Sequence, residues 1–185
     1  MATATKEAFG AALKQMMNIK PMDRITVKDL VEICKVNRQT FYYHFDDVYD
    51  LLEWIFEQDA ESVLPEQMSA ENWKTDFMSF FNYLQENRTF VINVYNSNSR
   101  LYMLRFFKTK LDFYIRSYVD TVAYGKNLER NDYEFIIDFY SSCIVGAISQ
   151  WLDLGMNLPP NFTVQRLLLA VSNNIERLVD KFEVK

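Results

Sequence analysis

Residues 37–45 gather side chains whose types and spacing suit contact with DNA. Arg38 and Gln39 fall in the first turn of a predicted helix, the position from which a helix in the major groove reaches base edges. Arginine pairs well with guanine and glutamine with adenine. The other polar side chains of the segment offer hydroxyl groups or an imidazole to phosphate oxygens: Thr40, Tyr42, Tyr43 and His44. The pattern favours a DNA-recognition helix, although any small helical hairpin with a capped second helix has the same spacing.

Two helix starts, 11 residues apart, would position these side chains. Thr26 and Asn37 can each cap a helix, because their side-chain oxygens can accept from backbone N–H groups of the first turn. Each cap follows an apolar residue and precedes another at the fourth helical position, so the hydrophobic staple occurs twice. The interval holds one helix of about two turns and a short turn. The sequence therefore predicts a helix-turn-helix at residues 25–45.

The segment Asn37–Phe45, NRQTFYYHF, resembles the DNA-binding head of TetR-family transcription regulators. The family's pattern is a capping residue, a variable pair, then Thr, an apolar residue, Tyr, an aromatic residue and His-Phe. The resemblance implies a three-helix head over about residues 4–45, bound to a double-stranded DNA operator. It further implies phosphate contacts by some of these side chains and base contacts by others. The implied DNA-binding set is Thr26, Lys28, Asn37, Arg38, Gln39, Thr40, Tyr42, Tyr43 and His44.

The chain departs from this pattern at two places. Lys35 stands where the family usually has Gly, and a positive φ there would cost a non-Gly residue about 1 kcal/mol. At the start of the fourth helix, Asp46, Asp47 and Val48 replace a run that usually includes a phosphate-holding Lys. We expect the acids to cap the helix and to weaken the phosphate clamp, and a Lys at position 48 to restore a backbone contact.

Composition and periodicity predict an all-α protein of about nine helices. The 185 residues are 49% hydrophobic with only 4 Gly and 4 Pro, which suits helices joined by short loops. The net charge is −5, but residues 1–45 hold seven Lys/Arg against four Asp/Glu, and the remainder carries −8. A basic head on an acidic body localises the attraction for phosphate. The family resemblance implies a helix-turn-helix domain at residues 1–46 and a ligand-binding and dimerisation domain at residues 47–185.

The sequence argues against catalysis. The single histidine, His44, lies within the DNA-binding motif, and no Cys/His cluster, Gly-rich phosphate loop or G-x-S-x-G is present. We expect neither an enzyme nor a cofactor or metal. Without a signal peptide or an 18-residue apolar window, a cytoplasmic location and no membrane partner are expected. Cys34 and Cys143 are expected to be buried, reduced thiols.

Two long apolar helices, at about residues 131–156 and 163–182, predict a homodimer interface. Their apolar positions cover much of each circumference, so one face could build the core while a second subunit covers the other. The alternative is that both helices are buried within one chain. The family resemblance implies dimerisation through the last two helices. The expected interface residues are Phe139, Cys143, Gly146, Ala147, Gln150, Val171, Ile175 and Leu178.

A small-molecule effector is implied by the same resemblance, bound among the fifth to eighth helices. Aromatic side chains are dense there, although ordinary core packing would explain them as well. The candidate pocket residues are Phe77, Phe81, Tyr95, Tyr102, Phe106, Phe107, Tyr114 and Trp151. The segment 146–156, GAISQWLDLGM, has a looser resemblance to regulators of dihydroxyacetone-kinase operons. Repression is the commoner mode in the family, but neither the sign of regulation nor the effector follows from the sequence. The alternative function is a helical dimer that keeps the fold and acts through a protein partner.

Overall fold

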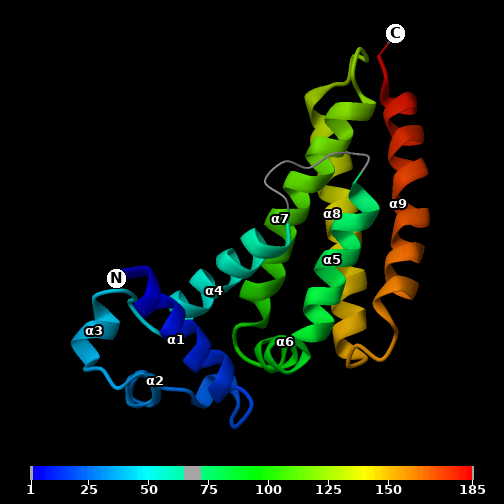
Figure 1. Ribbon diagram of the computed structural model, residues 1–185. Coiled ribbons are helices and arrows are strands. Elements are labelled where there is room, and N and C mark those ends of the chain that lie inside the picture. The colour runs from blue at the N-terminus through cyan, green and yellow to red at the C-terminus, as the bar shows by residue number, and fades with distance from the viewer. Residues whose placement is uncertain (1, 65–71, 185) are drawn as a thin grey trace. The chain divides into compact units, whose positions relative to one another are not determined.

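The computed structural model describes residues 2–64 and 72–184, and within them the fold is all-α, as predicted (Figure 1). One short 3-10 helix, η1 (Met22–Arg24), and an isolated β-bridge between Leu128 and Glu183 accompany nine α-helices in these residues. The α-helices are α1 (Ala2–Met16), α2 (Val27–Cys34), α3 (Arg38–Tyr42), α4 (Val48–Val63), α5 (Trp73–Glu86), α6 (Arg88–Tyr95), α7 (Arg100–Val122), α8 (Arg130–Asp153) and α9 (Pro160–Phe182).

The helices form two compact units that do not follow the order of the chain. Unit 1 comprises the described parts of Met1–Ser62 together with Asn87–Met103. Unit 2 comprises the described parts of Val63–Glu86 and Leu104–Lys185. The helix-turn-helix thus shares a unit with most of α4 and with α6. The boundaries of the expected functional domains, 1–46 and 47–185, differ from those of the two units, and the domains stay a prediction.

An aromatic cluster forms the core of the head in unit 1. Phe9 of α1 and Phe41 of α3 are both fully buried, and their rings meet edge to face with centroids 5.1 Å apart. Phe45 lies 5.7 Å from Phe41 and 6.4 Å from Phe9. Leu30 of α2 is fully buried as well. These residues carry the apolar faces predicted from the spacing, and they fix α3 against α1.

Both predicted caps of the helix-turn-helix are confirmed. The Thr26 side chain accepts from the Asp29 backbone N–H, and the Asp29 carboxylate accepts from the Thr26 backbone N–H, which completes a capping box. The Asn37 Oδ1 accepts from the Thr40 backbone N–H at 2.9 Å. Each cap satisfies an N–H group that the helix itself leaves without a partner.

The start of α4 confirms one expectation and overturns another. The Asp47 Oδ1 accepts from the backbone N–H groups of Tyr49 at 2.7 Å and Asp50 at 2.9 Å, so this acid caps α4 as predicted. Val48, however, is only 8% exposed and packs within unit 1. The expectation that position 48 faces the DNA backbone is therefore wrong, because the apolar valine is part of the core.

Unit 2 contains α5, α8 and α9 and most of α7, with α9 packed against α5 and α8 (Figure 1). Phe81 of α5 and Trp151 of α8 are buried with ring centroids 5.1 Å apart. Among the described residues, α8 alone is long and apolar enough to cross a membrane by length and composition. Because its Ile136, Ile144 and Ile148 are fully buried within unit 2, α8 is a core helix.

The two cysteines are free, and their burial differs from the expectation. Cys34 is half-buried, and burial raises the pKa of its thiol. Cys143 is exposed on α8, so the prediction of a buried thiol is wrong there. The apolar periodicity of α8 did not reveal which of its faces is inward.

Replacing Lys35 with Gly should stabilise the protein. Lys35 ends α2 with φ 54° and ψ 42°, the left-handed conformation that the sequence suggested. A side chain strains this conformation by about 1 kcal/mol, although the greater freedom of Gly in the unfolded chain offsets part of the gain. We expect Lys35→Gly to raise the free energy of unfolding by about 0.5 kcal/mol, measured by urea denaturation. A lower stability would contradict this account of the turn.

Candidate nucleic-acid interface

The outer face of α3 presents the side chains that the sequence singled out. Arg38 and Gln39 are exposed in its first turn. Tyr42 is 55% exposed and Tyr43 82% exposed, which is unusual for such large rings. His44 is half-buried just beyond the end of α3, and its ring meets that of Tyr43 edge to face at 4.9 Å. One short helix and the turn after it therefore bring these five side chains together.

The threonines and the asparagine of the set form hydrogen bonds that cap α2 and α3. The Thr26 Oγ1 donates to the Asp29 Oδ2 at 2.7 Å, and the Thr40 Oγ1 donates to the Asn37 Oδ1 at 3.1 Å. A hydroxyl group has one proton to donate. Thr26 or Thr40 could donate to a phosphate only if its hydrogen bond to Asp29 or Asn37 were broken. The groups best placed to meet DNA are thus Arg38, Gln39 and the exposed tyrosines.

An ion pair steadies the start of α2. The Lys20 Nζ lies 2.7 Å from the Asp29 Oδ2. Its hydrogen bond, followed by that from Thr26, lowers the pKa of Asp29 to about 2. The carboxylate therefore stays charged at neutral pH and holds both the cap and Lys20. This pairing was not expected from the sequence.

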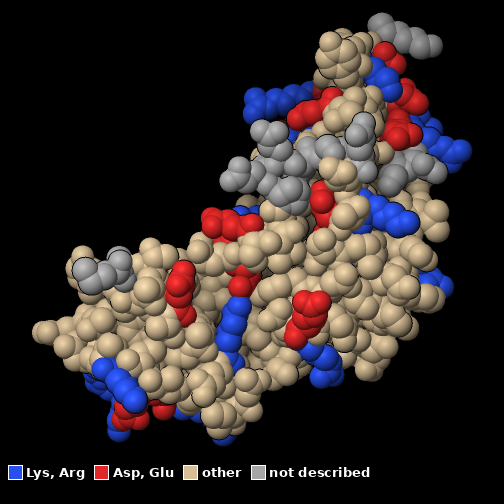
Figure 2. Space-filling view, viewed as in Figure 1, with Lys and Arg blue, Asp and Glu red and all other residues tan. Residues whose placement is uncertain are grey.

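Cations and acids are interspersed over the head. Lys28, which the family resemblance places near the DNA backbone, is 67% exposed and lies 3.8 Å from Glu32 across one turn of α2. An exposed pair of this kind contributes little to stability and is screened by salt, so Lys28 can exchange Glu32 for a phosphate at small cost. Figure 2 shows the surface of the head that faces the viewer as mostly uncharged, with blue and red groups close together at its lower edge.

Asn93 of α6 is a site residue that the sequence analysis missed. Its side chain bonds to three backbone groups of the segment 17–22, which leads into the helix-turn-helix. The one sequence signal is a polar amide inside the apolar run FVINVY, residues 90–95. Nothing local in the sequence indicates the segment to which that amide bonds.

The candidate pocket residues fall in both units. Tyr95 and Tyr102 belong to unit 1, where Tyr102 stacks on Phe56 at 6.1 Å and the Arg100 guanidinium lies 4.1 Å from the centre of the Tyr95 ring. The other six belong to unit 2; Phe106 is half-buried and the remaining five are buried: Phe77, Phe81, Phe107, Tyr114 and Trp151. Their rings form ordinary core contacts, which was the open alternative.

Three buried polar groups lie among the rings of α5 and α7. The Trp73 Nε1, the Asp76 Oδ2 and the Tyr114 hydroxyl have no hydrogen-bond partner among the described residues. Trp73 stacks on Phe77 with centroids 5.2 Å apart, and Phe77 meets Tyr114 at 6.2 Å. Burial raises the pKa of Asp76, and burial together with the nearby Asp76 raises the pKa of Tyr114. A buried polar group without a hydrogen-bond partner destabilises the fold by about 1–3 kcal/mol, so most such groups in native proteins are paired.

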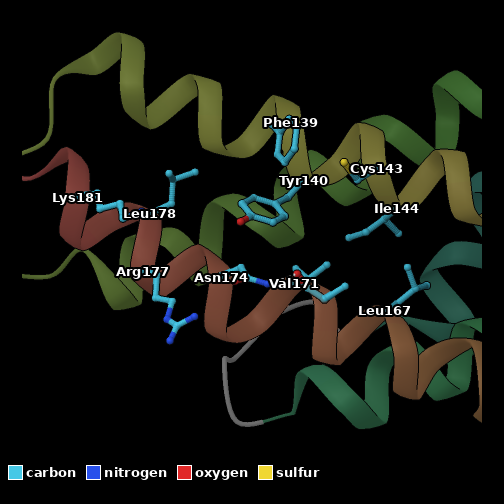
Figure 3. A pocket seen from close by; sticks show the side chains of 11 residues that line it. Phe139, Tyr140, Cys143, Ile144, Leu167, Val171, Asn174, Arg177, Leu178 and Lys181 are labelled. Atoms are coloured by element: carbon cyan, nitrogen blue, oxygen red, sulfur yellow. Dashed lines mark hydrogen bonds between the residues drawn. The ribbon is translucent and has the colours of Figure 1, made fainter.

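A groove of about 540 Å³ lies between α8 and α9 (Figure 3). Its lining includes four of the expected interface residues, namely Phe139, Cys143, Val171 and Leu178. Arg177 and Lys181 give it a cationic end on α9. In the close-up, Tyr140 and Ile144 of α8 point toward α9, from which Val171 and Leu167 point toward α8. The groove therefore coincides with the predicted dimer face.

The other expected interface residues divide by burial. Gly146 and Gln150 are exposed on the same face of α8 as Phe139 and Cys143, and Ala147 is half-buried beside them. Val171 is 3% exposed and Ile175 is fully buried, so both belong to the core of unit 2. Val171 also lines the groove between α8 and α9. The part that these two residues play in an interface with a second subunit stays a prediction.

Comparison with known proteins places the chain in a family. A family model of the TetR class, described as the transcriptional regulator C-terminal region, matches residues 71–173, more than half of the chain. A curated relative, the HTH-type dhaKLM operon transcriptional activator of Lactococcus lactis subsp. lactis (strain IL1403), is 30% identical over 91 residues. The match covers 49% of each protein, so the chain spans about half the length of that relative.

The fold is also found in a solved structure. The dihydroxyacetone kinase operon activator DhaS superposes with a TM-score of 0.69 over 97% of this chain and 98% of its own, at 21% sequence identity. At that identity the likeness concerns the fold alone. The family model confirms the resemblance drawn from residues 37–45 and identifies a class of regulators rather than of enzymes. The chain belongs to the TetR family of transcriptional regulators.

Proposed function

We propose that this protein is a homodimeric, cytoplasmic regulator that binds a double-stranded DNA operator through α3. One observation carries the proposal: a capped helix-turn-helix presents Arg38, Gln39, Tyr42 and Tyr43 outward while Phe41 is fully buried beneath them. The geometry suits base contacts from the first turn and phosphate contacts from the tyrosines. Members of the family bind DNA operators, which supports the same conclusion.

Regulation would follow from two arrangements of the paired heads. An effector that binds one arrangement more tightly shifts the population toward it, and DNA affinity changes by that differential affinity. The curated relative and the matched structure are both named as activators, whereas repression was the commoner expectation. Their names describe those proteins, and the mechanism proposed here accommodates either sign.

Substitutions in α3 should separate base contacts, which set sequence preference, from phosphate contacts, which set affinity for all DNA sequences. Arg38→Ala and Gln39→Ala should flatten discrimination at one or two base pairs by about 1–3 kcal/mol each, because they remove base-edge hydrogen bonds. Tyr42→Phe and His44→Ala should weaken binding to all sequences similarly, because phosphate contacts carry no sequence information. The measurement is fluorescence anisotropy with duplexes that the native protein selects from a random library.

The matched control is Arg105→Ala, which removes an exposed arginine from α7 in unit 2. It should leave both affinity and base preference unchanged. Unchanged operator binding in all four α3 variants would show that this helix is not the recognition element.

Dimerisation through α8 and α9 is supported by a surface that the protomer leaves unfilled. A Cβ atom built on Gly146 meets nothing within 4 Å, so packing within the chain does not require glycine there. Glycine inside a helix is less stable than alanine by about 0.5–1 kcal/mol. Close approach by a second helix would account for its presence. Phe135, Phe139 and the groove between α8 and α9 lie exposed nearby, as a surface for a second copy would.

Gly146→Arg should therefore separate the dimer without unfolding the protomer. The guanidinium has room within the chain but would be desolvated between packed helices, which is costly for an unpaired charge. We expect sedimentation as a monomer at micromolar concentration with the helical circular dichroism retained. Ser79→Arg, at an exposed position of α5, is the control and should remain dimeric. A native protein that sediments as a monomer would exclude this interface.

We propose an effector site that includes Trp73, Asp76 and Tyr114. The indole can only donate, while a phenol and a neutral carboxyl group can both donate and accept. Burial raises the pKa of Asp76, because desolvation disfavours the charged carboxylate. A small polyol or hydroxyketone, with both hydrogen-bond donors and acceptors between apolar rings, has matching chemistry.

A ligand screen by thermal unfolding tests this site. A matching polyol or hydroxyketone at a hundredfold excess over its Kd should raise Tm by about 5–10 °C. Asp76→Asn should abolish much of that shift, whereas Asp132→Asn, the same change at the start of α8, should retain it. A panel that contains no stabilising compound, or one that stabilises the native protein and Asp76→Asn equally, would contradict the assignment.

A protein partner in place of DNA is the second candidate. The acids at the start of α4 favour it, because the Asp47 carboxylate already occupies the N–H groups that could otherwise hold a phosphate. The recognition face of α3 argues more directly for DNA. The selection of duplexes described above separates the two, since a protein that acts only through a protein partner would enrich no sequence.

A further inference from the structure

The amide of Asn93 is fully engaged by the backbone of the head, within unit 1. Its Oδ1 accepts from the Met22 N–H at 2.7 Å, and its Nδ2 donates to the Met17 carbonyl at 2.9 Å and the Lys20 carbonyl at 3.1 Å. The bonds span more than seventy residues of sequence. Because all three partners are backbone groups, the amide fixes the path of the chain itself.

The segment that Asn93 holds is the exit from α1. Carbonyl groups in the last turn of a helix have no partner within the helix. Met17 and Met22 are 3% and 2% exposed, so water does not readily replace a lost bond. An amide can meet both needs, since it supplies two donor hydrogens and an accepting oxygen. An aspartate at this position would keep the acceptor and lose both donors.

A second contact joins the segment 17–23 to the end of α6, and here the side chain comes from the head and the backbone group from the segment after α6. The Asp23 carboxylate in η1 accepts from the Asn98 backbone N–H, with both oxygens 3.2 Å from the nitrogen. The Lys14 Nζ of α1 lies 5.2 Å from the centre of the Phe90 ring in α6. The capping box of α2 begins three residues after Asp23. These contacts therefore stand directly ahead of the helix-turn-helix.

We propose that Asn93 is a positioning residue that locks the helix-turn-helix onto α6, so that both move as one body. The inference rests on the proposed function as a dimeric DNA-binding regulator. In a dimer, the lock would make the spacing of the two recognition helices depend on α6. Without the lock, each head would shift against α6 and accept half-sites at several spacings.

The readout that separates positioning from plain stability is spacing discrimination. Two inserted base pairs rotate one half-site by about 70° and move it by about 7 Å. Locked heads cannot follow this change, so the native protein should lose about tenfold or more in affinity for the lengthened duplex. Released heads follow it, at the expense of weaker binding to the original spacing.

The experiment compares Asn93→Ala and Asn93→Asp with the native protein on the selected duplex and on the same duplex lengthened by two base pairs. Both variants should lose about tenfold on the original duplex and little on the lengthened one, so the ratio of the two affinities falls toward one. Asn96→Ala, an exposed asparagine just after α6, is the matched control and should keep the native ratio. An equal loss on both duplexes, or no loss, would overturn the proposal.

Asp23→Ala keeps the test decisive if the Asn93 variants fold poorly. Its bonds are solvent-exposed, so its loss should spare folding while lowering the spacing ratio in the same direction by a smaller factor. Removing a negative charge raises DNA affinity at every spacing alike, and this general effect cancels in the ratio. An Asp23→Ala protein with the native ratio would count against the lock.

Hydrogen exchange tests the lock without DNA and so distinguishes its failure from failure of the proposed function. In Asn93→Ala the Met22 amide loses its acceptor, and its exchange should quicken by about fivefold or more, while the amides of α8 keep their native rates. Unchanged exchange at Met22 would overturn the lock even if the protein binds DNA. If exchange at Met22 is faster in Asn93→Ala but the native protein selects no DNA, the lock is supported and the proposed DNA-binding function is refuted.

Discussion

The recognition face depends on the burial of Phe41 beneath a helix too short to be stable by itself. α3 has five residues, and isolated helices below about a dozen residues are marginal in water. Burying a phenylalanine of this kind contributes about 1.5–3 kcal/mol, and here the ring also meets Phe9 edge to face. With Phe41 inward and Asn37 capping the first turn, Arg38, Gln39, Tyr42 and Tyr43 must point outward. The outward direction of the proposed DNA-contacting side chains thus depends on the buried Phe41 ring.

The packing that holds α3 continues into the rest of unit 1. Phe41 packs on α1, and the exit from α1 is held by Asn93 of α6. The Lys14 ammonium of α1 also pairs with Asp59 of α4 at 2.7 Å. The head is therefore joined to α4 and α6 by polar contacts of definite geometry, and a change in either helix would be passed on to it.

Local signals in the sequence predicted most of the architecture but not its long-range contacts. The caps at Thr26 and Asn37 and the left-handed turn at Lys35 depend on neighbouring residues, so sequence alone could specify them. The burial of Val48 and Ile175 and the exposure of Cys143 depend on which of two apolar faces is covered, and periodicity does not decide that. The partners of Asn93 lie more than seventy residues away and leave no local trace. The contacts of the site residues with DNA, effector and second subunit stay predictions.

The most direct test of DNA binding by this head is the salt dependence of operator affinity. The segment 1–45 carries a net charge of only +3, and Asp47 occupies the first N–H groups of α4. Each head should therefore neutralise about three phosphates and a dimer about six, so log K should fall against log salt with a slope near −5. Anisotropy titrations of the selected duplex at several salt concentrations give this slope directly. A slope near −5 is the predicted result; a slope near zero, or no binding at low salt, would contradict DNA recognition by α3.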